Sequence, residues 1–177
     1  MGDNGTGKGM ADRATIGGKV LSGMKGTMLE CGGLVPMIAN WPGKTPAGRV
    51  CADLVDSTDF IVSFGEVIGA KLPGMTFDGQ SMAPQLLGQP AKPREWVFNQ
   101  LARMWYVREA QWKLNEKGEL FDMSKAPFTE NLVITDTETS QAARKRLQAV
   151  LFELNPGGGI LDQGDGTGRH AHKPKRK

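Results

Sequence analysis

Glycine is concentrated at the start of this 177-residue chain, and this distribution constrains the fold more than any other feature of the sequence. Residues 1–33 contain ten of the 24 glycines and few large apolar side chains. Glycine loses more conformational freedom on folding than any other residue, and it brings no side chain to a core. We therefore predict that residues 1–33 are a looping segment rather than a run of regular elements.

The rest of the composition is that of a globular protein. Apolar residues make up 39% and charged residues 23% of the chain, which argues against wholesale disorder. The longest apolar runs are far too short to cross a membrane, and the first 30 residues do not resemble a secretory signal. Two cysteines, Cys31 and Cys51, cannot form a disulfide framework and are expected to be free thiols.

The net charge of +3 comes from the C-terminal tail. Residues 163–177 carry a charge of +4 and both histidines, His170 and His172, so residues 1–162 carry about −1. Without a histidine, the body alone cannot provide Ser-His-Asp, Cys-His or histidine–metal chemistry. The tail has no interleaved aromatic residues, so we expect residues 157–177 to be a disordered basic tail that binds neither nucleic acid nor membrane.

Apolar periodicity changes along the chain, and it predicts helices and strands in different places. A buried strand is expected over 34–41, a helix over 53–69 and an irregular connection over 72–94. Further strands are expected over 96–101, 105–114 and 120–123, the last two joined by a hairpin loop at 115–118. A capping box at 135–138 precedes an amphipathic helix from about Glu138 to Leu154, which Asn155-Pro156-Gly157 ends.

Three interpretations of the first nine residues stay open on residue types alone. Gly2 to Gly9 nearly match a phosphate-binding loop with Lys8 as its lysine, but position 9 is glycine and offers no hydroxyl for magnesium. Asp3-Asn4-Gly5 is typical of a tight turn. Asp3 and Asn4 are also hard oxygen ligands of the kind that calcium or magnesium prefers, although calcium takes about 6–8 oxygens and two side chains are only part of a site.

Lys25 lies in the glycine-flanked segment Gly23-Met24-Lys25-Gly26-Thr27. A lysine in this setting can bring a compact positive charge to an oxyanion without crowding from its neighbours. The alternative is an ordinary solvated loop lysine.

Taken in order, seven segments of the chain resemble the sulfatase family of the alkaline-phosphatase superfamily, specifically the C-terminal part of an arylsulfatase-like enzyme. The resemblance runs from residue 2 to about residue 154. The segments that carry it are Asp3-Asn4-Gly5; Gly23–Thr27 with Glu30 and Gly32; Val35–Gly43; Asp53–Phe60; Phe77–Ser81 with Pro84–Gly88; Trp112–Leu114; and Leu120–Pro127.

The resemblance implies an α/β fold: a truncated alkaline-phosphatase-like sulfatase with a remnant of the large mixed sheet and a small antiparallel sheet packed by a C-terminal helix. The implied organisation has the end of the catalytic domain at 1–52, a helix and irregular connection at 53–94, and a C-terminal subdomain at 95–156. Sulfatases hydrolyse sulfate esters with a formylglycine nucleophile and a calcium ion. By position, Asp3 and Asn4 match the family's metal-binding pair, and Lys25 matches the lysine that binds a sulfate oxygen.

The chain differs from the sulfatase family in lacking the motif that provides the nucleophile. It contains no C/S-x-P-x-R motif, from which formylglycine is made, and no counterpart of the early metal aspartates or catalytic histidines. We therefore expect a sulfatase fragment that lacks the N-terminal half and is inactive alone. The alternative is a non-catalytic metal- or oxyanion-binding remnant, or a partner subunit that needs a second chain. Family resemblance implies a periplasmic or extracellular location.

Overall fold

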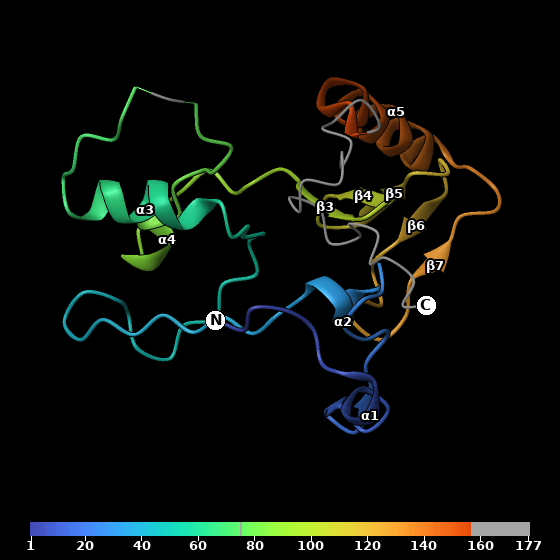
Figure 1. The fold of residues 1–177 in the computed structure, drawn as a ribbon, viewed down its shortest axis with the longest axis horizontal. Coiled ribbons are helices and arrows are strands. Elements are labelled where there is room, and N and C mark those ends of the chain that lie inside the picture. The colour runs from blue at the N-terminus through green and yellow to red at the C-terminus, as the bar shows by residue number, and fades with distance from the viewer. Residues whose placement is uncertain (75, 157–177) are drawn as a thin grey trace, which may run out of the picture. The chain divides into compact units, whose positions relative to one another are not determined.

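The computed structural model describes residues 1–74 and 76–156, and within them the chain forms two compact units. The first unit consists of Met1–Asp3 and Pro36–Val97. The second consists of Asn4–Val35 and the residues from Phe98 onward. Figure 1 shows the elements of both units along the chain. The predicted division at residues 52 and 94 remains a prediction.

Among its described residues, the first unit contains two helices, α3 (Asp59–Val67) and α4 (Ala83–Leu86), which contact each other. The helix predicted over 53–69 thus begins six residues late. The backbone N–H and the hydroxyl of Thr58 both donate to the Asp56 carboxylate, at 2.9 Å each, so the chain turns here before the helix starts. Gly69 ends the helical run with a positive φ of 65°, as predicted.

A buried ion pair lies at the centre of the first unit. Asp59 is 2% exposed, and its carboxylate accepts hydrogen bonds from the Arg94 guanidinium and from the backbone N–H groups of Asp56 and Gln80. Burial raises the pKa of Asp59, but the Arg94 hydrogen bond and the two backbone donors outweigh burial and hold that pKa below its ordinary value. This arrangement joins α3 to the segment that leads into the sheet.

The strand predicted over 34–41 is wrong, since this segment forms no strand in the described part of the chain. Pro36 has no N–H to donate, and its carbonyl accepts a hydrogen bond from the Gly2 N–H at 3.0 Å. Ile38 is 86% exposed. An apolar run becomes a strand only where neighbouring strands pair with its backbone, and no ladder partner meets this one.

The second unit contains two antiparallel sheets and three helices among the described residues. The glycine-rich segment forms only short elements, as expected from its composition. The elements in chain order are α1 (Lys8–Ala11), β1 (Thr15–Ile16), β2 (Lys19–Val20), α2 (Glu30–Gly33), β3 (Val97–Leu101), β4 (Met104–Arg108), β5 (Trp112–Asn115), β6 (Leu120–Asp122), β7 (Asn131–Leu132) and α5 (Glu138–Leu154).

The larger sheet has five strands in the order β3-β4-β5-β6-β7, each antiparallel to the next in the pairs β4–β5, β5–β6 and β6–β7. A single strand over 105–114 was predicted, and this is wrong. The chain turns at Glu109–Gln111, and β5 pairs back on β4 with Val107 opposite Leu114. The hairpin between β5 and β6 is confirmed, with Gly118 at a φ of 74°.

Helix α5 packs on one face of this sheet, and its predicted bounds are confirmed. The capping box forms two residues later than expected: the Thr137 hydroxyl accepts from the Ser140 N–H, and Ser140 accepts from the Thr137 N–H. Asn155 ends the helix in the left-handed conformation. A row of buried side chains crosses the sheet on this face and meets Ala143 and Leu147 of α5; the row is Val107, Leu114 and Leu120.

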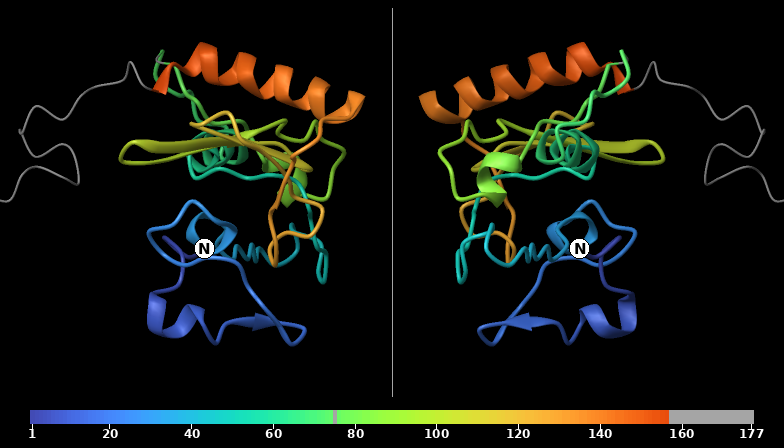
Figure 2. Two further views of the ribbon diagram at one scale, coloured as in Figure 1. Left: turned by 90° about the vertical axis from the view of Figure 1, so that its right-hand side faces the viewer. Right: turned by 90° about the vertical axis from the view of Figure 1, so that its left-hand side faces the viewer.

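The glycine-rich loops lie on the opposite side of the sheet from α5, as both views of Figure 2 show. The fold therefore has the predicted class: a mixed α/β chain with a small antiparallel sheet covered by a C-terminal helix. None of the helices in the described part is both long and apolar enough to span a bilayer. The predicted basic tail at 157–177 lies outside the described residues.

Candidate functional site

Lys25 lies at the tip of a small closed turn on the loop side of the sheet. The Thr27 hydroxyl donates to the Met24 carbonyl at 2.7 Å, and the Thr27 N–H donates to the same oxygen at 3.0 Å. Gly26 has a φ of 85°, which L side chains rarely adopt. The Lys25 side chain is exposed, so its ammonium group faces solvent from a turn that is fixed by its own hydrogen bonds.

Asn4 and Gly5 pack against the same region of the chain. A Cβ atom on Gly5 would lie 1.8 Å from the Cys31 carbonyl oxygen, so only glycine allows the two backbones to come this close. Gly32 is equally constrained, because its Cβ would lie 2.0 Å from the Thr27 carbonyl oxygen. Gly5 and Gly32 thus allow close backbone packing between the two motifs and the segment that follows them.

A backbone hydrogen bond joins the two predicted motifs. The Lys25 N–H donates to the Thr6 carbonyl at 2.8 Å, which places the lysine turn beside the Asn4-Gly5-Thr6 segment. Lys25 and Asn4, predicted from separate motifs, therefore belong to neighbouring loops of one unit. Asn4 is half-buried, and Asp3, the residue before it, is exposed.

The oxygen ligands do not make a calcium site by themselves. Calcium takes about 6–8 oxygens, and Asp3 and Asn4 offer only two side chains. Within the described ranges, no group of three or more His, Cys, Asp or Glu side chains lies close enough to hold a metal ion. The assignment of Asp3 and Asn4 as metal ligands therefore remains a prediction.

Beneath the lysine turn lies a set of buried charges, which sequence analysis did not predict. Strand pairing places Arg108 of β4 directly opposite Lys113 of β5, so two cations share one face of the sheet. Two carboxylates neutralise them: Glu30 of α2 lies 3.2 Å from Arg108, and Glu130 forms an ion pair with Lys113. The four side chains are at most 15% exposed. We call these four residues the charge quartet.

The charge quartet also hydrogen-bonds to the backbone of residues 22–31, the loop that carries Lys25, which we call the lysine loop. The Lys113 ammonium donates to the Met28 carbonyl at 3.1 Å, and the Glu30 N–H donates to Glu130 Oε1 at 2.9 Å. Lys113 also lies over the rings of Tyr106 and Phe121, 4.9 and 5.4 Å from their centroids. A lysine with this many partners is held in one position.

Burial dominates the electrostatics of this region. Burial raises the pKa of Glu30, and the nearby Arg108 cation opposes that rise only in part. Burial, and then the Glu30 carboxylate, raise the pKa of Tyr106 to about 12. Tyr106 accepts a hydrogen bond from Asn99 at 3.3 Å and lies against Gly33 of α2, so it takes part in packing α2 on the sheet.

One signal in the sequence points to the charge quartet. Lys113 stands between Trp112 and Leu114 in a strand-forming segment, and a buried cation there needs a carboxylate partner. Nothing local identifies that partner, because Glu130 lies 17 residues away and Glu30 comes from another part of the chain.

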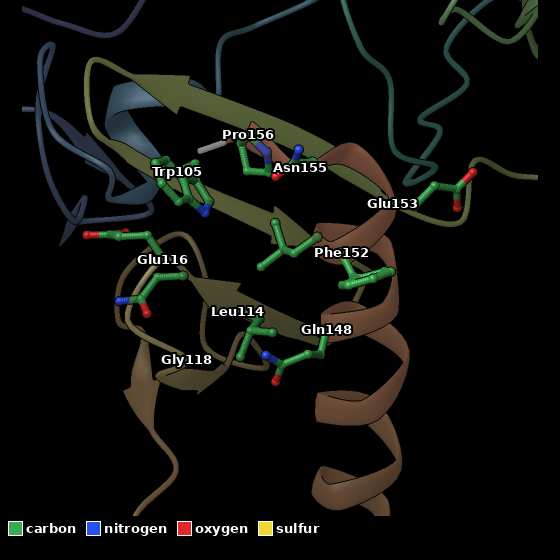
Figure 3. Close-up of a pocket in the computed structure, with 11 residues that line it drawn as sticks. Trp105, Leu114, Glu116, Gly118, Gln148, Phe152, Glu153, Asn155 and Pro156 are labelled. Atoms are coloured by element: carbon green, nitrogen blue, oxygen red, sulfur yellow. The ribbon is translucent and has the colours of Figure 1, made fainter. Parts of the chain in front are cut away.

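A groove between α5 and the strands β4 and β5 is not part of this site. Figure 3 shows it between Trp105 and Leu114 of the sheet and Gln148 and Phe152 of α5. It lies on the helix-covered face and contains none of the predicted site residues, and its acidic lining residues are Glu116 and Glu153.

Comparison with known proteins supports the resemblance seen in the motifs. No family model matches the chain. It is 39% identical over 74 residues to arylsulfatase A from Bos taurus, and 30% identical over 107 residues to arylsulfatase D from Homo sapiens. These matches cover 42% and 59% of this chain but only 14% and 17% of the relatives. The chain thus spans less than a fifth of the length of these relatives.

A solved structure of a provisionally assigned sulfatase from Bacteroides thetaiotaomicron is also similar. It has a TM-score of 0.41 and 22% identity, and the match covers 54% of this chain and 23% of that one. The two arylsulfatase matches support the resemblance of this chain to the C-terminal portion of a sulfatase.

Proposed function

We propose that this chain forms the part of a sulfuric ester hydrolase active site that binds the sulfate group, with Lys25 as the residue that contacts a sulfate oxygen. The observation that supports this most is the hydrogen bond from the Lys25 N–H to the Thr6 carbonyl, because it places the lysine loop beside the loop that begins at Asn4. The arylsulfatase matches supply the substrate class.

Lys25 suits this role because its ammonium group is exposed at a fixed turn. A compact positive charge stabilises negative charge that develops on the leaving-group oxygen as the S–O bond breaks. Gly26, the next residue, has no atom within 4 Å of the position where a Cβ would lie, which leaves room for a sulfate group to approach. The loop thus provides charge without steric crowding.

Asp3 and Asn4 would supply two of the oxygen ligands of a calcium ion in the assembled site. Their carboxylate and amide oxygens are of the type calcium prefers, and the other ligands have to come from elsewhere. When bound, the ion would polarise the sulfate group.

Alone, this 177-residue chain is proposed to be inactive, since its sequence contains no C/S-x-P-x-R motif to provide the nucleophile. The test is turnover of a chromogenic aryl sulfate by the purified chain in calcium-containing buffer. We expect no hydrolysis above the buffer rate. Hydrolysis that follows the protein through purification would overturn the proposed inactivity.

Complementation separates a catalytic fragment from a simple binding module. The chain is mixed with a second polypeptide, the N-terminal region of an arylsulfatase carrying a mature formylglycine, and turnover is measured again. Restored turnover supports the proposed function. Tight binding of calcium or sulfate to the chain alone in calorimetry, with no turnover after mixing, favours instead a non-catalytic metal- or oxyanion-binding remnant.

A further inference from the structure

The loop that carries Lys25 is closed at its base, and both of its ends are hydrogen-bonded to the connection between β6 and β7. The Cys31 N–H donates to the Ser22 carbonyl at 2.8 Å and closes the loop. The Ser22 N–H donates to the Pro127 carbonyl at 2.9 Å, and the Glu30 N–H donates to the Glu130 carboxylate. Both ends of the loop therefore contact one short segment, 127–130.

Lys113 contacts the lysine loop on the C-terminal side of Lys25. Its ammonium donates to the Met28 carbonyl, three residues beyond Lys25, and forms an ion pair with Glu130. The side chains of Lys113 and Glu130 are 4% and 3% exposed, so water competes little for these contacts. One buried pair thus binds the loop backbone at two points, Met28 and Glu30.

The lysine loop also brings a carboxylate to the face of the sheet that carries two cations. Arg108 and Lys113 lie opposite each other on one face, and like charges at directly opposed positions repel. Glu30, which comes from the lysine loop, provides the carboxylate beside Arg108. When the loop is docked, the Glu30 carboxylate thus lies beside one of the two opposed cations.

We propose that Lys113 and Glu130 are positioning residues for Lys25: they fix the lysine loop on the sheet so that the Lys25 ammonium is presented at one place. This inference rests on the proposed role of Lys25 in binding sulfate. Lys113 itself touches no substrate, because it is buried between the sheet and the loop. The Thr6 carbonyl holds the loop on its other side through the Lys25 N–H.

Hydrogen exchange in the full chain tests the positioning role without reference to activity. The double variant Lys113→Met with Glu130→Gln removes both charges together, because removing only one would leave the other buried and unpaired. The glutamine keeps an acceptor for the Glu30 N–H, so the fold is expected to survive. We expect amide exchange in residues 22–31 to become about tenfold faster or more, with exchange in β4 and β5 unchanged, since a hydrogen bond from a charged group to the loop is lost.

Leu147→Ala is the matched control, because it creates a cavity on the opposite face of the same sheet, where Leu147 is 1% exposed. That variant should raise exchange in the loop and in the sheet by similar factors. If the double variant also changes loop and sheet together, the pair is merely structural and the positioning role is wrong.

Turnover of the complemented assembly separates the two proposals. If Lys113 and Glu130 position Lys25, the double variant lowers kcat by about tenfold or more and changes KM little, because a misplaced charge weakens mainly the transition state. A wild-type kcat despite a loosened loop overturns the positioning role. If instead Lys25→Ala leaves turnover unchanged, the proposed function of Lys25 fails, whatever the exchange of the loop shows.

Discussion

Lys113 and Met28 are 85 residues apart in sequence, yet the Lys113 ammonium donates a hydrogen bond of 3.1 Å to the Met28 carbonyl. This contact joins the antiparallel sheet of the C-terminal half to the glycine-rich loop that carries Lys25. A cation that is buried in this way requires a carboxylate, and Glu130 supplies it. The loop that carries Lys25 is thus supported by strands that lie far from it in sequence.

Replacing Lys25 by alanine should affect turnover and not stability. The side chain is exposed, so the free energy of unfolding of Lys25→Ala should equal that of the wild type. In the complemented assembly, kcat should fall by about 10²–10³-fold, the usual effect of losing one group that stabilises developing negative charge. The matched control is Lys8→Ala, an exposed lysine of the same glycine-rich segment, which should keep full turnover.

The Glu30 carboxyl should make stability depend on pH in a specific direction. Its pKa in the folded chain is raised above the ordinary value of 4.5, so the folded state holds the proton more tightly than the unfolded state does. As pH rises from 4.5 through the raised pKa, the free energy of unfolding of the wild type should therefore fall relative to that of Glu30→Gln. Urea denaturation of both proteins across this range measures the difference. If the free energy of unfolding of the wild type instead rises relative to that of Glu30→Gln as pH rises, the pKa of Glu30 is not raised.

The Asp59–Arg94 pair should dominate the stability of the first unit. Asp59→Asn leaves the buried Arg94 without its charged partner, and we expect a loss of about 3 kcal/mol near neutral pH. Because the pKa of Asp59 is lowered, the stabilisation by its carboxylate is present above 3.8 and is lost as pH falls through the lowered pKa. Native-state amide exchange in α3 measures both effects. Glu95→Gln, which removes an exposed ion pair with Lys92, should leave this exchange unchanged.

Gly5 should tolerate no side chain. Its Cβ would meet the Cys31 carbonyl oxygen at 1.8 Å, so Gly5→Ala has to push the Asn4 segment away from the lysine loop. We expect a loss of about 1–3 kcal/mol in the free energy of unfolding, together with faster exchange of the Lys25 N–H. Gly7→Ala is the control: nothing lies within 4 Å of its Cβ and its φ is −64°, so stability should be unchanged or slightly raised. Equal effects of the two substitutions would contradict close packing at Gly5.

The local sequence pattern was sufficient to predict the elements that depend on residues close to one another in sequence. The helix at 138–154 follows from the spacing of Ala143, Leu147 and Leu151, and the hairpin after β5 follows from Gly118. These succeed because helical periodicity and turn conformation depend on neighbours in sequence. The two candidate motifs, around Asn4 and around Lys25, were also visible as residue types, and the glycines around them indicated loops.

Pairing across the chain was decided only by the tertiary structure. The apolar run at 34–41 has the composition of a strand but pairs with no strand among the described residues, and the run at 105–114 turns back on itself to become β4 and β5. In both cases the outcome depends on which distant backbone lies alongside, and composition does not encode that.

The same reason governs the site. The sequence by itself determined which residues offer charge and oxygen ligands: Asp3, Asn4 and Lys25. The tertiary structure decided that the Lys25 N–H donates a hydrogen bond to the Thr6 carbonyl. It also decided that the charge quartet, Glu30, Arg108, Lys113 and Glu130, forms one buried network. Hydrogen bonds and ion pairs act over a few ångströms in space, so residues far apart in sequence become partners only when the fold brings them together.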